Sequence, residues 1–307
     1  MKFLKKYETV EIEDEEKVDL LEEQEFFDLL QSYRHTPIYK LKATEKALSE
    51  LEKAFALDQT DSRILMELDQ LYKRLEYSSD FRLQNLEKHL NLVLDRDDLY
   101  LERAALCNSL GLYEKAFELI IVRRFHPWEG GEGKVTGQYV FSLTEQAKKA
   151  ISLKSYKEAV ELLLMARHYP ENLGEGKLFG AQENAIYYWL GCAYEGLGLT
   201  EKAIESWNVA SAGMNQPGTA IFYNDQQSDS IYYQGLALNR LGKKSEAKER
   251  FEMLIHFGEI HLNDEFKLDY FAVSLPDLQI WDDDLSRRNN KNCQELIALG
   301  KLGMSLR

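Results

Sequence analysis

Several features are scarce in this 307-residue chain, and each scarcity argues against a class of protein. Its three cysteines, Cys107, Cys192 and Cys293, are far apart and odd in number, which argues against a disulfide framework and for a reduced, cytoplasmic protein. The formal net charge of −14 argues against nucleic-acid binding, which needs a basic face. No window approaches the ~18 apolar residues of a membrane span, and the acidic start lacks the apolar run of a signal peptide. With only five prolines, few helices are interrupted.

One short phrase occurs four times between residues 110 and 247. It reads LGLYEKA at 110–116, LKSYKEA at 153–159, LGLTEKA at 197–203 and LGKKSEA at 241–247. The closing alanines, Ala116, Ala159, Ala203 and Ala247, are spaced by 43, 44 and 44 residues. A fixed period in this range is typical of stacked helical repeats. Each phrase also has the composition of a turn at which one helix ends, often at Gly, and an amphipathic helix begins. The sequence therefore predicts an all-α repeat protein.

The residues around these phrases resemble the tetratricopeptide repeat. That repeat carries a bulky residue, Leu-Gly and Tyr on its first helix, and Ala, an aromatic residue and Ala on its second. One unit matches at every position, with Tyr187, Leu190, Gly191, Tyr194, Ala203, Trp207 and Ala210. The next unit matches at most positions, and the two before it match more loosely. The resemblance implies a right-handed superhelical solenoid of antiparallel helix pairs, in which small residues let the helices approach and bulky residues fill the space between them.

The repeat pattern divides the chain into four segments. We expect an acidic N-terminal segment with an entry helix at 1–35, divergent helical repeats at 36–96, tetratricopeptide-like repeats with inserted loops at 97–258, and a C-terminal capping segment at 259–307. In the last segment a break at Pro276 is followed by a predicted final helix that carries Leu285, Cys293, Leu296 and Ile297. A solenoid needs such a helix to cover its last open face.

The inserted loops contain a second repeated motif. An ordinary tetratricopeptide repeat has about 34 residues, so each unit here has roughly ten more, placed between its second helix and the next unit. A Gly-Glu-Gly-Lys tetrapeptide recurs in two of these loops, at 131–134 and 174–177. It is not a phosphate loop, because Trp128 and Glu171 stand where that motif requires Gly. Either the glycines and charges serve the loop structure, or the loops form a ligand-binding edge. The edge residues would be His126, Trp128, Glu132, Lys134, Glu175 and Lys177.

The inner wall of the predicted solenoid is the other candidate binding surface. If Asn184 and Ser228 begin their units, the wall carries Tyr188, Glu195, Asp229, Tyr232, Asn239 and Arg240. Tyrosines beside polar groups suit recognition of a peptide or a sugar, although such tyrosines can equally pack between units. We expect Tyr188 and Tyr232 to face the groove while Tyr187 and Ile231 are buried, and Arg240 to anchor a carboxylate.

No catalytic or metal-binding constellation is apparent. His256 and His261 are five residues apart, which does not place them on one helical face, so no zinc site is predicted. No nucleophile motif rises above background, and neither a cofactor nor a membrane partner is expected.

Some longer phrases are similar to the repeat region that follows an all-β domain of unknown function in large bacterial proteins, often found beside glycan-degrading enzymes. These phrases are FHPWEGGEGK at 125–134, NLGEGK at 172–177 and YFAVSLPDL at 270–278. The resemblance implies no catalytic residue. The sequence thus predicts a cytoplasmic, non-catalytic scaffold that binds a protein or peptide segment in its groove. The alternative, implied by the resemblance, is glycan binding or glycan hydrolysis.

Overall fold

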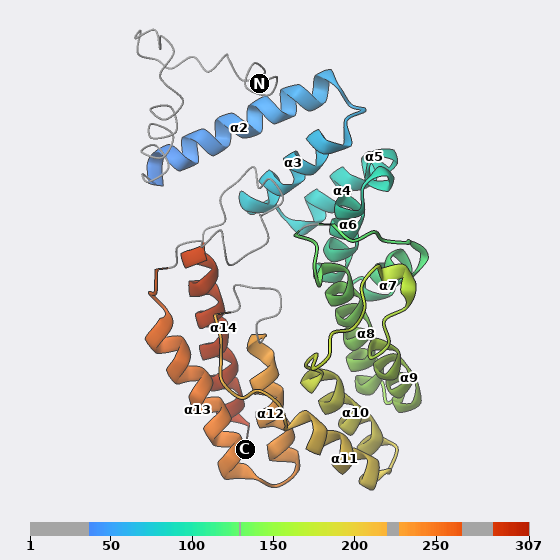
Figure 1. The fold of residues 1–307 in the computed structure, drawn as a ribbon, viewed down its shortest axis with the longest axis vertical. Coiled ribbons are helices and arrows are strands. Elements are labelled where there is room, and N and C mark those ends of the chain that lie inside the picture. Colours follow the sequence, from blue (N-terminus) through green and yellow to red (C-terminus); the bar gives the residue numbers. More distant parts are fainter. Residues whose placement is uncertain (1–36, 129, 220–226, 266–284, 307) are drawn as a thin grey trace. The chain divides into compact units, whose positions relative to one another are not determined.

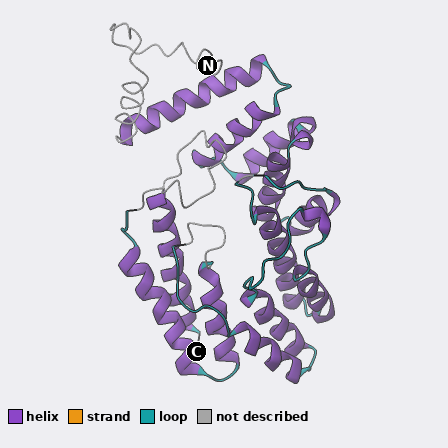
Figure 2. Ribbon diagram, viewed as in Figure 1, coloured by secondary structure: helices purple, strands orange, loops and turns teal. Residues whose placement is uncertain are grey.

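A computed structural model gives the fold and describes residues 37–128, 130–219, 227–265 and 285–306. Within those residues the chain contains α-helices and one short 3₁₀ helix, and no strand (Figure 2). It divides into two compact units, Met1–Gln59 and Thr60–Arg307. The first unit contains helix α2 (Pro37–Leu57). The expected acidic segment and entry helix at 1–35, Pro276 and the phrase at 270–278 lie outside the described residues.

The second unit is a succession of helices. Its first helices are α3 (Ser62–Arg74), α4 (Ser79–Lys88) and α5 (Leu90–Asp95). Three pairs follow: α6 (Asp97–Ser109) with α7 (Tyr113–Val122), α8 (Lys134–Ser152) with α9 (Tyr156–Ala166), and α10 (Asn184–Gly196) with α11 (Thr200–Ala210). The 3₁₀ helix η2 (Glu171–Leu173) lies between α9 and α10. The last pair is α12 (Ser228–Arg240) with α13 (Lys244–His261), followed by α14 (Leu285–Ser305). The predicted all-α repeat solenoid is confirmed (Figure 1).

Each repeated phrase forms the tight turn inside one pair. Its second residue adopts a left-handed conformation, with φ of 75° at Gly111, 62° at Lys154, 74° at Gly198 and 76° at Gly242. The following N–H then bonds back across the end of the first helix, as from Leu112 to the carbonyl of Cys107 at 2.9 Å. Glycine adopts this conformation without strain. At Lys154 the same conformation is strained, because the Cβ atom comes close to the following carbonyl oxygen.

Small residues let the two helices of a pair approach closely. The four closing alanines are at most 1% exposed. A Cβ atom on Gly191 would lie 2.2 Å from the Trp207 indole, and one on Gly235 would lie 2.4 Å from the Phe251 ring. The glycine of one helix thus makes room for the aromatic ring of the other, which explains why the sequence pattern couples these two residue types.

Helix α14 covers the last pair. It packs against both α12 and α13, and Leu296, 1% exposed, joins Ile231 and Leu254 in a small buried cluster. The helices lie so close that a Cβ atom on Gly258 would be 2.6 Å from the Cys293 carbonyl oxygen. The expected capping helix is therefore present.

Candidate functional site

The first helices of successive pairs form one continuous surface. Helix α6 contacts α8, α8 contacts α10, α10 contacts α12, and α12 contacts α14, while each second helix contacts the first helix of the next pair. Because the first helices pack directly on one another, the stack curves toward them. We call the surface formed by α8, α10, α12 and α14 the inner wall (Figure 1).

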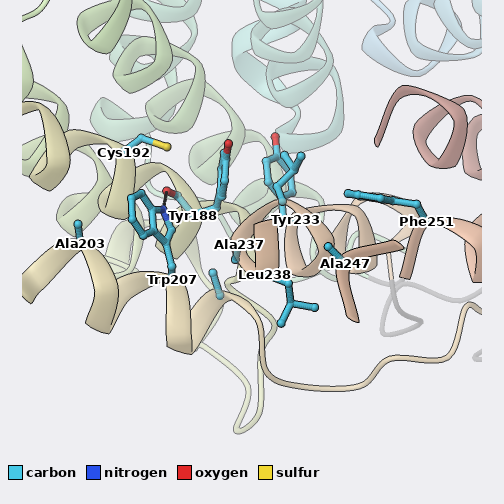
Figure 3. Packing of buried hydrophobic residues seen from close by; sticks show 11 residues of the cluster. Tyr188, Cys192, Ala203, Trp207, Tyr233, Ala237, Leu238, Ala247 and Phe251 are labelled. Atoms are coloured by element: carbon cyan, nitrogen blue, oxygen red, sulfur yellow. Dashed lines mark hydrogen bonds between the residues drawn. The ribbon is translucent and has the colours of Figure 1, made fainter. Parts of the chain in front are cut away.

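Four aromatic rings gather where α10 meets α12. The ring centre of Tyr188 lies 5.1 Å from that of Trp189 and 5.6 Å from that of Tyr233. The Trp189 indole N–H donates a hydrogen bond of 3.3 Å to the Tyr233 hydroxyl. Tyr232 completes the set, with its ring centre 5.6 Å from that of Tyr233. Tyr188 and Tyr233 point to the same side of their helices (Figure 3). We call these four residues the aromatic cluster.

The expected division into wall and core residues is wrong at Tyr188. This side chain is only 8% exposed, whereas Tyr187 is half-buried with the Arg167 guanidinium 4.6 Å from its ring centre. The reason is that Tyr188 packs beside Tyr233 in the buried cluster between the two pairs. Burial raises the pKa of Tyr188 to about 12. Tyr188 therefore forms the base of the wall.

The structure agrees with the expectations for Ile231 and for the first residues of the two units. Ile231 is buried as expected, at 1% exposure, and Tyr232 is half-buried. The Tyr232 ring also approaches Phe251 of α13, at 6.0 Å between ring centres. The predicted starts of the two units, Asn184 and Ser228, are the first residues of α10 and α12.

The charged residues at the far end of the wall pair with each other. Arg240 Nη1 lies 3.1 Å from Glu195 Oε2, and the Arg240 guanidinium carbon lies 5.5 Å from the Trp207 ring centre. Asn239 is half-buried beside Arg240. Arg240, the expected carboxylate anchor, thus already holds a carboxylate of this chain. Both members of the pair are about half exposed, so the pair is weak and open to exchange.

A second charged group lies beside the aromatic cluster. Lys148 of α8 forms an ion pair with Glu145, and its ammonium nitrogen lies 5.5 Å from the Trp189 ring centre. Asp229 stands in the first turn of α12 and is half-buried. Burial raises the pKa of Asp229, the negative charge of Glu295 on α14 raises it further, and Lys148 partly offsets both effects.

Sequence reasoning missed Trp189, Tyr233 and Lys148. A signal for the first two was present, because Trp189 and Tyr233 are 44 residues apart and both aromatic, in the same register as the tyrosines that the sequence singled out. Lys148 carried no comparable signal, since it reaches Trp189 only through the packing of α8 on α10.

The two inserted loops are joined to each other and to the helices. The Glu175 carboxylate accepts hydrogen bonds from the Gly133 N–H, at 3.0 and 3.1 Å, and from the Thr136 hydroxyl, at 3.2 Å. Gly133 directly precedes α8, so Glu175 caps that helix with a negative charge. The Asn172 side chain donates to the carbonyls of Ile120, in the last turn of α7, and Arg123, which follows it, at 3.0 and 2.9 Å, and so satisfies carbonyls that lack a partner within the helix.

Three of the remaining loop-edge residues have contacts within the chain. Lys177 pairs with Glu183 at 2.6 Å and donates to the Arg167 carbonyl at 3.3 Å. The backbone N–H of His126 donates to Asp97 at 2.8 Å. Trp128 covers Gly131, where a Cβ atom would lie 2.2 Å from the indole. Glu132 is half-buried and Lys134 is exposed. Of the charged residues in the two repeated tetrapeptides, Glu175 therefore binds a backbone N–H and a hydroxyl group of the preceding loop and helix, and Lys177 pairs with Glu183.

Among the described residues, no group of three or more His, Cys, Asp or Glu side chains is placed to hold a metal ion. None of the described helices is both long and apolar enough to cross a membrane.

No protein-family model matches this chain. It is similar to solved structures of MamA. The structure of MamA 41-end from Desulfovibrio magneticus RS-1 is 16% identical, with a TM-score of 0.35 over 65% of this chain and 96% of that chain. The MamA RS-1 ArsTM double mutant is 16% identical, with a TM-score of 0.35 over 66% of this chain and 97% of that chain. A further MamA crystal structure is 14% identical, with a TM-score of 0.30 over 72% of this chain and 92% of that chain. At such low identities and TM-scores, these likenesses carry no argument about function.

Proposed function

We propose that this chain is a non-catalytic scaffold that binds a protein or peptide segment along its inner wall. The observation that carries the proposal is the aromatic cluster, in which two successive first helices bring four rings together, with Trp189 and Tyr232 half-buried and Tyr188 and Tyr233 buried. Aromatic side chains lose little conformational entropy on binding and offer a large contact area with polar edges. Grooves lined with such rings are a common way to recognise peptides.

The six predicted groove residues divide by role in this proposal. Tyr188 forms the base, and Tyr232 contributes contact surface together with Trp189. Asp229 stands at the start of α12, while Asn239 and Arg240 stand at its end, near Glu195 on α10. An extended segment lying across the aromatic cluster would therefore meet polar groups on both sides.

The loop edge serves the fold in this proposal. Glu175 caps α8, and Lys177 pairs with Glu183, so both are engaged within the chain. The glycan-related role implied by the family resemblance predicts binding of an oligosaccharide instead. No contact among the described residues favours that ligand over a peptide.

The test is a selection of random peptides displayed on phage against the immobilised full-length chain. The dissociation constants of the selected peptides are then measured for three proteins. These are the wild type, Trp189→Ala and the matched control Phe179→Ala, which removes an aromatic ring that is fully exposed at the loop edge. We expect Trp189→Ala to weaken binding at least about thirtyfold, which corresponds to the ~2 kcal/mol of a hot-spot residue, and Phe179→Ala to have no effect.

The melting temperature of each variant is measured alongside, because Trp189 is half-buried. Peptides that bind Trp189→Ala as tightly as the wild type, or that lose affinity with Phe179→Ala instead, would refute the inner wall as the binding surface. Selective binding of oligosaccharides on a glycan array, with no peptide recovered, would favour the glycan alternative.

A further inference from the structure

The inner wall already holds a cation against an aromatic face. The ammonium group of Lys148, from α8, lies 5.5 Å from the ring centre of Trp189, on α10. Positive charges within about 6 Å of an indole face are attracted by the negative charge of its π-system. The Tyr233 hydroxyl, bonded to the Trp189 N–H, also interacts with Lys148. This part of the aromatic cluster is therefore suited to an ammonium or guanidinium group.

Two carboxylates belong to the same wall, on α12 and α14. Asp229 lies one helical turn before Tyr233 on α12, and Glu295 lies on α14, which packs against α12. In the part of the chain that the structure describes, neither carboxylate belongs to an ion pair, and Lys148 forms its own ion pair with Glu145. Two neighbouring like charges repel each other, and a cation placed between them would remove this cost.

The charge of the whole protein favours the same ligand. A formal net charge of −14 attracts basic partners and repels acidic ones before contact is made. Arg240, at the end of α12, is paired with Glu195, which offsets its positive charge. The surface thus combines aromatic rings, two carboxylates that form no ion pair with another described residue, and a negative net charge of the whole protein, and all three favour a positively charged partner.

We infer that Asp229, Glu295, Trp189 and Tyr233 form a subsite for a lysine or arginine side chain of a partner protein segment, and that Lys148 competes with that side chain. This inference rests on the proposed function, because it names the chemistry of a segment bound to the inner wall. The competition follows from position, since Lys148 lies on the ring face that an incoming cation would use.

The test uses fluorescence anisotropy with three labelled peptides of equal length at near-physiological salt. The first contains several lysines, the second has the same lysines acetylated, and the third has glutamates in their place. We expect the full-length chain to bind the lysine peptide at least about tenfold more tightly than the acetylated one. The double variant Asp229→Asn, Glu295→Gln should lose about tenfold in affinity for the lysine peptide, and Lys148→Met should gain several-fold.

A second double variant controls for net charge. Glu201→Gln with Glu205→Gln removes two exposed carboxylates from α11 and changes the net charge by the same amount. Equal losses in the two double variants would show that only the overall field matters, and would overturn the subsite. Weaker binding by Lys148→Met, or failure of the lysine peptide to bind, would overturn it as well.

The outcome for the glutamate peptide separates this inference from the proposed function. If the glutamate peptide binds best and loses affinity with Trp189→Ala, the inner wall binds peptides but the subsite chemistry is wrong. If phage-selected peptides bind Trp189→Ala with the same dissociation constant as the wild type, the proposed function itself is refuted.

Discussion

Replacing Glu175 by Ala should destabilise the repeats around α8 although the side chain lies in a loop between α9 and α10. Its carboxylate accepts a bifurcated hydrogen bond from the Gly133 N–H and a second hydrogen bond from the Thr136 hydroxyl, 39 or more residues away in sequence. The substitution removes both hydrogen bonds and the negative charge at the start of α8. It also removes one of the links between the two inserted loops, which the hydrogen bond from the Phe125 N–H to the Asn172 carbonyl still joins.

The magnitude follows from these contacts. Loss of a helix cap costs about 0.5–2 kcal/mol, and the charge at a helix N-terminus contributes about 0.3–1 kcal/mol. We therefore expect Glu175→Ala to lower the free energy of unfolding by about 2 kcal/mol. Glu175→Gln keeps an acceptor oxygen but loses the charge, so it should cost about half as much.

The assay is urea unfolding followed by circular dichroism. With a slope of about 3 kcal/mol per molar urea, a loss of 2 kcal/mol shifts the midpoint by about 0.7 M. Lys177→Ala is the matched control, since it removes a charge from the same loop. The Lys177–Glu183 ion pair is partly exposed, so its loss should cost less than about 1 kcal/mol. Equal midpoints for Glu175→Ala and the wild type, or a larger shift for Lys177→Ala, would refute the reasoning.

Three further predictions concern the turns, the cap and acid stability. Lys154→Gly should raise the free energy of unfolding by about 0.5–1 kcal/mol in urea titration, because it relieves a left-handed residue with φ of 62°; a loss of stability would contradict this. Leu296→Ala should cost about 2–5 kcal/mol, since the side chain is 1% exposed, whereas Leu302→Ala, 50% exposed, should leave the melting temperature nearly unchanged. Burial alone would raise the pKa of Asp97, but hydrogen bonds from the His126 N–H and from Arg123 hold this pKa below its usual value. Its contribution to stability is therefore present above about pH 4 and is lost as the pH falls through the lowered pKa, so Asp97→Asn should flatten the acid side of the stability profile.

The repeat period gave the fold because each repeated residue has one structural task. A small residue is required where the helices of a pair cross, and Ala203 and Ala247 occupy this position. A residue that tolerates positive φ is required in the turn, and Gly198 and Gly242 occupy that position. These requirements recur at fixed spacing, so a single sequence displays them. The capping helix was predictable for a related reason, since its apolar residues follow helical spacing after the repeats end.

The candidate site was less predictable because it depends on contacts between units. Register alone placed Tyr188 on the groove surface, but the packing of α10 on α12 buries it beside Tyr233. The loop edge looked like a ligand surface because Glu175 and Lys177 recur with the repeat. Only the fold shows that the Glu175 carboxylate turns back to the preceding loop, where it binds the Gly133 N–H.

Hydroxyl-radical footprinting read by mass spectrometry tests the central claim, binding on the inner wall, most directly. The full-length chain is oxidised with and without its tightest phage-selected peptide, and modification of each aromatic side chain is compared. Bound peptide should protect Trp189 and Tyr232, which are half-buried on the wall, and leave Trp128 and Phe179 of the inserted loops unchanged. Protection of Trp128 and Phe179, with Trp189 and Tyr232 oxidised as in the free chain, would contradict the account.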